Sequence, residues 1–291
     1  MKNKSESTEA RRGTQGETKK QLLVKLYPFS HGAWAHTNVS RIALFGRNLA
    51  EATSPKRYDR FRAALEEYLK EVFPALDEIA REHQVARLDS TLPDSLRSHA
   101  DELARIAAAI SQNARLSAED VQCFEEEIPK HSDRILSVLH EAREDLLRGF
   151  RCWPADILAT IVEERQTADE TRGISYSVEV TNPDQMVVAD EEDFRRVINW
   201  LIDGIRGEGG GRTSLFSLSA GDRWLLEIQN KKLFIPLHLW QEIFIGKGLS
   251  GHEELVRVPE IVRNYDGDVC VKASSEAAGT TILLRLRIQG Q

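Results

Sequence analysis

The spacing of the apolar residues changes its period near residue 150. From Gln21 to Phe150 the apolar residues recur three and four positions apart, whereas many of the later ones alternate with polar residues. A period of about 3.6 residues places side chains on one face of a helix, and a period of two places them on one face of a strand. The sequence therefore predicts two domains: an all-α helical bundle over 21–150 and an α+β domain over 151–291.

Four amphipathic segments make up the predicted bundle. They run over 34–51, over 57–83, from Pro93 onward and from Ser117 onward. Ser117 and Asp120 have the spacing of a capping box, in which each residue bonds to the backbone of the other. Pro74 and Pro129 lie inside two segments, where we expect a bend or a break. Because the connections are short, the helices should pack antiparallel, as one four-helix bundle or as two hairpins.

Strand-like and helical stretches alternate in the second domain. Strands are expected at 174–180, 186–188, 214–219, 224–228, 269–273 and 281–288, and helices at 157–166, 191–206 and 256–263. Several neighbouring strands have short connections, so we expect largely antiparallel pairing, with the helices covering one face of the sheet.

Composition and charge exclude several classes of function. A net charge of -7 and a pI near 5.7 argue against a nucleic-acid partner. Residues 1–20 are polar and read as a disordered tail without the apolar region of a signal peptide, and no apolar stretch is long enough to span a membrane. We therefore expect a cytoplasmic protein. The 3 cysteines lie far apart without zinc-ligand spacing, so no metal site is expected.

Two stretches of the second domain resemble motifs of one superfamily. VVADEEDFRRVINWLIDGIR at 187–206 is similar to the N-box helix of sensor histidine kinases. YDGDVCVKASSEAAGTTILLRLR at 265–287 is similar to the final helix, strand and strand of their catalytic domain. The second domain thus resembles the GHKL ATPases and kinases. This resemblance implies an α+β sandwich, which in the family binds ATP and magnesium.

The positions with which that family holds nucleotide are changed in this chain. In the family, an Asn of the N-box helix holds magnesium and an Asp reads the adenine amino group. Here the two Asn positions hold Trp200 and Gly204, Asn199 is one residue out of register, and the Asp position holds Asn230. The glycines of the expected lid are out of register as well: Gly246, Gly248 and Gly251. Because each lost partner weakens binding, we predict a GHKL fold that uses neither ATP nor another cofactor.

A stretch of the first domain resembles a second group of signalling proteins. HTNVSRIALFGRNL at 36–49 is similar to the histidine helix of histidine phosphotransferases, above all the sporulation initiation phosphotransferases of bacilli. The resemblance implies that His36 carries the phosphoryl group and that Arg41 neutralises a phosphoryl oxygen. It also implies that Thr37 and Ser40, being small, let a partner approach. An imidazole nitrogen suits this role because it is nucleophilic near neutral pH.

Helical geometry separates the candidate histidines. His36 lies about 100° around its helix from the apolar stripe, on a flank that a partner can reach. His99 and His131 fall on the apolar stripes of their own segments and are expected in the core or an interface. Two alternatives stay open: that His36 is an ordinary surface residue, or that another histidine carries the phosphoryl group.

These patterns predict a two-component or phosphorelay protein, acting as a histidine phosphotransferase. A phosphoryl group would move between the receiver-domain Asp of a response regulator and His36, without ATP. The partner would be a receiver domain or a histidine kinase, and the bundle would form within one chain or in a homodimer. One alternative is a non-catalytic pseudokinase scaffold for the same partners. Another is a divergent active sensor histidine kinase that uses Asn199 or Asn230.

Overall fold

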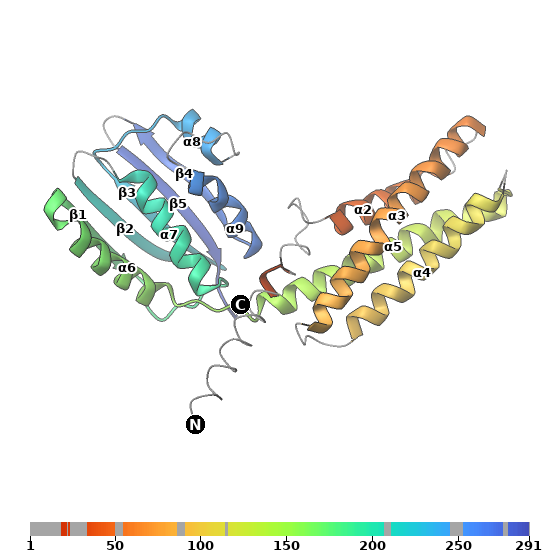
Figure 1. The fold of residues 1–291 in the computed structure, drawn as a ribbon, viewed down its shortest axis with the longest axis horizontal. Coiled ribbons are helices and arrows are strands. Elements are labelled where there is room, and N and C mark those ends of the chain that lie inside the picture. Colours follow the sequence, from red (N-terminus) through yellow and green to blue (C-terminus); the bar gives the residue numbers. More distant parts are fainter. Residues whose placement is uncertain are drawn as a thin grey trace, which may run out of the picture. The chain divides into compact units, whose positions relative to one another are not determined.

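The computed structural model (Figure 1) divides between Leu146 and Leu147 into two compact units. The structure describes residues 19–21, 23, 34–49, 55–85, 91–113, 116–206, 211–244, 253–275 and 279–290. Most of the expected tail and all three lid glycines lie outside these ranges. In the described ranges no helix is long and apolar enough to cross a bilayer.

Four long helices of the described residues form a bundle in the first unit. They are α2 (Trp34–Arg47), α3 (Pro55–Val85), α4 (Thr91–Gln112) and α5 (Ala118–Leu147). Helix α3 packs between α2 and α4. His99 of α4 contacts His131 of α5, and Gly46 of α2 packs against Ile128 of α5. The four helices therefore close a ring within one chain, and the predicted apolar stripes are buried inside it.

The ends and the prolines of these helices follow from local chemistry. The capping box at the start of α5 is confirmed: the Asp120 N–H donates to Ser117 Oγ at 3.0 Å, and the Ser117 N–H donates to Asp120 Oδ2 at 3.1 Å. Pro74 and Pro129 lie inside α3 and α5, and neither helix ends there. Apolar residues are buried on both sides of each proline, so packing outweighs the hydrogen bond that a proline removes.

The second unit follows most of the predicted order of helices and strands. Its elements are α6 (Pro154–Asp169), η2 (Glu170–Arg172), β1 (Ile174–Val180), α7 (Glu191–Ile205), β2 (Gly211–Ala220), β3 (Arg223–Asn230), α8 (Leu237–Phe244), η3 (Glu253–Arg257), α9 (Val258–Asn264), β4 (Asp268–Ser275) and β5 (Gly279–Arg287). Helices α6, α7 and α9 cover one face of the sheet (Figure 1). Alternate residues of the inner strands face these helices and are buried, among them Leu215, Leu226, Ile228 and Leu284.

The five-stranded sheet is mixed, with the order β1-β2-β3-β5-β4. The three pairs among β2, β3, β5 and β4 are antiparallel, as expected. Strand β1 runs parallel to β2, with Val178 opposite Leu215. The parallel pair arises because the chain crosses over through α7 before it returns to the sheet.

Two expectations about this unit were wrong. Residues 186–188 form no strand: Val187 makes only isolated bridges to Cys152 and Ile288. The chain leaves the sheet at once because Asp190 caps α7, its carboxylate accepting from the N–H groups of Glu192 and Asp193. The short helix α8 was not predicted, since its eight residues are too few to display a helical period.

Candidate functional site

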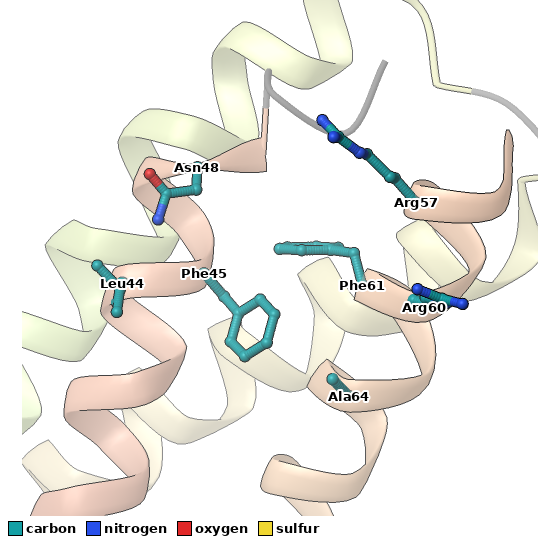
Figure 2. Close-up of a pocket in the computed structure, with 7 residues that line it drawn as sticks. All are labelled: Leu44, Phe45, Asn48, Arg57, Arg60, Phe61 and Ala64. Carbon is teal, nitrogen blue, oxygen red and sulfur yellow. The ribbon is translucent and has the colours of Figure 1, made fainter. Parts of the chain in front are cut away.

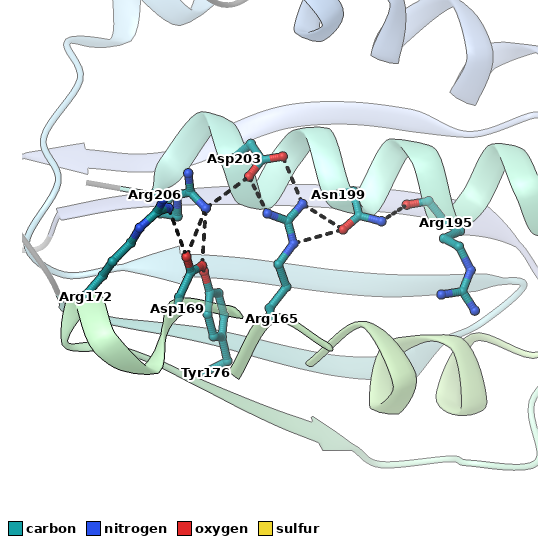
Figure 3. A network of polar contacts seen from close by, with 8 residues as sticks. All are labelled: Arg165, Asp169, Arg172, Tyr176, Arg195, Asn199, Asp203 and Arg206. Carbon is teal, nitrogen blue, oxygen red and sulfur yellow. Dashed lines mark hydrogen bonds and ion pairs between the residues drawn. The ribbon is translucent and has the colours of Figure 1, made fainter. Parts of the chain in front are cut away.

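Helix α7, the predicted N-box helix, turns one flank towards α6 (Figure 3). The guanidinium of Arg165 on α6 hydrogen-bonds to two side chains of this flank. It donates from Nη1 and Nη2 to the two carboxylate oxygens of Asp203 at 2.6 and 2.9 Å, and from Nε to Asn199 Oδ1 at 3.1 Å. The Asn199 amide in turn donates to the Arg195 carbonyl at 3.0 Å. Asn199, which the alternative of a divergent kinase would use, is therefore engaged by α6.

A buried carboxylate extends this network to β1. Asp169 is 1% exposed and accepts from the Tyr176 hydroxyl at 2.6 Å and from Arg206 at 3.2 Å. Burial raises the pKa of Asp169, but the Tyr176 hydroxyl and the Arg206 guanidinium outweigh burial, so its pKa lies below the ordinary value. Burial, followed by the bond to Asp169, raises the pKa of Tyr176 to about 12. These contacts fasten α6, β1 and α7 to one another.

The other flank of α7 faces η3. A Cβ added at Gly204 would lie 2.6 Å from Cδ1 of Leu255, which is itself 2% exposed. Trp200 precedes Gly204 by one helical turn on this flank, and the Arg196 guanidinium lies 6.0 Å from its ring centre. A leucine side chain thus fills the space into which a residue at position 204 would project.

Asn230, at the position expected to read adenine, hydrogen-bonds within the turn that follows it. It is 2% exposed, and its Oδ1 accepts from the N–H groups of Lys232 at 2.9 Å and Leu233 at 3.2 Å. This is the geometry in which an Asn side chain closes a turn by capping the next two or three N–H groups. The Asn230 oxygen is therefore occupied at the end of β3.

The cavity between α7, α9 and β5 is small. Its volume is about 10 Å³, and its lining includes Val197, Val262 and Leu284. The Tyr265 hydroxyl donates to Asp193 Oδ2 at 2.6 Å beside it, and burial raises the pKa of Tyr265. Pockets that hold small ligands usually measure several hundred Å³. Among the described residues, moreover, no three His, Cys, Asp or Glu side chains gather as metal ligands.

The predicted phosphotransfer residues lie on α2. His36 is in its first turn, but its side chain is outside the described residues. Thr37 is exposed and Ser40 half-buried. Arg41 is exposed; it donates to Asn38 Oδ1 at 3.3 Å, and its guanidinium lies 5.6 Å from the centre of the Tyr68 ring. The structure therefore places Arg41 against α3.

A groove between α2 and α3 lies further along the same helix (Figure 2). This α2–α3 groove has a volume of about 480 Å³ and is lined by Leu44, Phe45, Asn48, Arg57, Arg60, Phe61 and Ala64. The Phe45 and Phe61 rings meet edge to face, with centres 5.1 Å apart, and Leu44 is 59% exposed. Sequence reasoning missed this groove, although Leu44 and Phe45 lie off the buried stripe and were the available signal.

Comparison with known proteins gives structural matches alone. No family model matches the sequence, and no curated protein does. The catalytic domain of histidine kinase ThkA aligns with 48% of this chain and 95% of its own length, at 15% identity and a TM-score of 0.43. The mycobacterial sensor histidine kinase MprB aligns with 48% of this chain and 98% of its own length, at 18% identity and a TM-score of 0.42. Histidine kinase AdeS of Acinetobacter baumannii aligns with 67% of this chain and 98% of its own, at 15% identity and a TM-score of 0.40.

Proposed function

We propose that this chain is a two-component signalling protein that passes a phosphoryl group between a receiver-domain Asp and His36 without using ATP. The observation that carries the ATP-independent part is the contact of Leu255 with Gly204. In the family that the sequence resembles, an Asn of this helix holds magnesium, and position 204 is one of the two Asn positions. Here the residue is Gly204, and Leu255 occupies the space that an Asn side chain would enter.

Two other contacts support the same proposal. Arg165 engages both Asn199 and Asp203, so these two polar side chains of the predicted N-box helix bond to α6. Asn230 caps the turn that follows β3. Recruiting either Asn to a nucleotide would break existing hydrogen bonds of partly buried groups, which costs about 1–3 kcal/mol for each group left unsatisfied.

The α2–α3 groove supplies a docking surface for the receiver domain. Its floor is aromatic, and Arg57 and Arg60 border it. Receiver domains present a cluster of acidic residues around their phosphorylated Asp, and this charge is complementary to the two arginines. Leu44 lies eight residues after His36, about 12 Å along α2, so one docked domain can span both the groove and the histidine.

The proposed chemistry is a reversible displacement at phosphorus. The lone pair of an imidazole nitrogen of His36 attacks the acyl phosphate, a P–N bond forms, and the P–O bond to the Asp breaks, which releases the carboxylate. The receiver contributes its acidic site and its magnesium. Arg41 lies five residues after His36, about 140° around the helix, so its long side chain would have to leave Asn38 and Tyr68 to balance charge on the phosphoryl oxygens.

The first test is calorimetric titration of the full chain with a non-hydrolysable ATP analogue and magnesium. We expect no binding heat at millimolar nucleotide. Micromolar binding would refute the ATP-independent part of the proposal and favour a divergent kinase instead.

The second test is phosphoryl transfer from a phosphorylated receiver domain. Wild type and His36→Ala are compared, with His140→Ala as the matched control because His140 is an exposed histidine on another helix of the bundle. We expect labelling of wild type and of the control but not of His36→Ala. Labelling that survives in His36→Ala would rule His36 out as the carrier.

The same surface supports one alternative, a scaffold that binds receivers without chemistry, because the groove does not need His36. Arg60→Glu should weaken receiver binding at least tenfold, whereas Arg105→Glu on α4 should not. Binding that requires Arg60, in a chain that is never phosphorylated, would establish the scaffold. If Arg60→Glu binds the receiver domain as tightly as Arg105→Glu does, the groove is excluded as the docking site.

A further inference from the structure

Two imidazoles meet at the interface between α4 and α5. His99 Nδ1 and His131 Nδ1 lie 3.0 Å apart, and the ring centres are 5.2 Å apart. The His131 side chain is 12% exposed, and its Nε2 lies 3.1 Å from Glu127 Oε2. The pair has no part in the proposed phosphoryl transfer, and a hydrogen bond between its two nitrogens needs one donor and one acceptor.

We propose that the His99–His131 pair makes the packing of α4 against α5 sensitive to acid. Glu127 accepts the Nε2–H of His131, so neutral His131 presents a bare Nδ1 and His99 donates its Nδ1–H to it. A first added proton can be accommodated, because one imidazolium can still donate to one neutral ring. A second proton puts hydrogen on both facing nitrogens, and the hydrogen bond is replaced by repulsion between two cations.

Burial and the nearby cations oppose the second proton. The charged groups on the helices around it are Arg47 and Asp133 at the α2–α5 contact, Asp77 on α3, Arg97 and Asp101 on α4, and Glu127, Lys130 and Arg134 on α5. Glu127 bonds directly to the pair, and Lys130 also bonds to Glu127 at 2.9 Å. Burial, followed by His131, Arg134 and Lys130, lowers the pKa of His99.

The sign of the pH dependence follows from this direction. An unfolded chain protonates histidine at a pKa of about 6.5, above the lowered pKa of folded His99. The unfolded state therefore binds more protons as the pH falls below about 7, and acid destabilises the fold. The stabilising contribution is fully present above the unfolded pKa. Because the pair joins α4 to α5, the loss should be felt first at that interface.

The test is urea unfolding of the full chain between pH 8 and pH 5. His99→Asn is the informative variant, because the Asn amide nitrogen lies close to the place of Nδ1, donates to His131 and does not titrate. The wild-type unfolding constant should rise relative to that of His99→Asn by up to about tenfold per pH unit below pH 6.5. His140→Asn, at an exposed position of α5, should follow wild type.

Backbone hydrogen exchange at pH 5.5 and 7.5, corrected for intrinsic rates, shows which helices lose stability in acid. We expect wild-type peptides of α4 and α5 to lose protection at pH 5.5 before those of the second unit. Equal pH slopes for wild type and His99→Asn would overturn the proposal, as would acid-induced loss confined to the second unit. If His99→Asn does not fold, NMR titration of the wild-type histidines decides: one of the pair must titrate well below 6.5, and two independent titrations near 6.5 refute the coupling.

Discussion

Replacing Gly204 by Ala tests whether Leu255 fills the space beside α7. In a helix interior this change ordinarily stabilises, because Ala is about 1 kcal/mol more favourable than Gly. Here the new Cβ would lie 2.6 Å from Leu255 Cδ1 and 3.4 Å from its Cγ, in a buried site. Leu255 must therefore change its rotamer or shift together with η3.

The magnitude follows from two opposed effects. Forcing an additional carbon into a packed core costs about 1–3 kcal/mol, against a gain of about 1 kcal/mol from helix propensity. Gly204→Ala alone should therefore destabilise the chain by up to about 2 kcal/mol. Leu255→Ala alone should cost about 2–5 kcal/mol, because it opens a cavity. In the Leu255→Ala background the overlap is gone, so Gly204→Ala should stabilise by up to about 1 kcal/mol.

The assay is urea unfolding of the four members of this double-mutant cycle, followed by tryptophan fluorescence and circular dichroism. The expected result is a change of sign for Gly204→Ala between the two backgrounds, with a coupling free energy of about 1–3 kcal/mol. If Gly204→Ala has the same effect in both backgrounds, then Leu255 does not occupy the space at position 204. The argument for a filled magnesium position would then fail.

The remaining predictions concern one contact in each unit. Gly46→Ala should destabilise the bundle by about 1–3 kcal/mol, although Ala has a better helix propensity than Gly. The new Cβ would lie 2.7 Å from Cβ and Cγ2 of Ile128, and this β-branched side chain cannot rotate away. Thermal unfolding measures the loss of stability. Asp169→Asn should cost about 1–3 kcal/mol at pH 7, because it weakens the bonds to Tyr176 and Arg206. The pKa of Asp169 is lowered in the folded chain, so the difference in unfolding free energy between wild type and Asp169→Asn should persist above about pH 4 and narrow at lower pH. Urea unfolding at several pH values measures this difference. A difference that does not change with pH would contradict the reasoning.

Local patterns were sufficient for most of the fold. The apolar stripes predicted the four helices because burial of one face stabilises a helix more than any single residue opposes it, and this is also why Pro74 and Pro129 did not end α3 and α5. The same reasoning placed His99 and His131 at an interface, which their contact confirms. Local patterns failed at Val187, where a strand was expected and only isolated bridges form. The reason is that strand pairing depends on segments distant in sequence.

The candidate sites depended far more on tertiary contacts. The sequence indicated that Gly204 and Asn230 depart from the pattern of the family it resembles, but not that Leu255 packs against Gly204 or that Asn230 caps the turn after β3. The α2–α3 groove also escaped prediction, because the two aromatic residues that line it come from different helices. Periodicity orders residues along one element and carries no information on which element lies opposite.

The sequence by itself determined where most of the helices and strands form, how the chain divides, and which residue types occupy the expected nucleotide and phosphotransfer positions. Only the tertiary structure decided that α4 and α5 complete the bundle within one chain, that Arg165 engages Asn199, and that the two imidazoles face each other. The physical reason is the range of the interactions. Propensity, capping and amphipathic spacing act within a few residues along the chain, whereas packing and buried polar contacts join residues that the fold alone brings together.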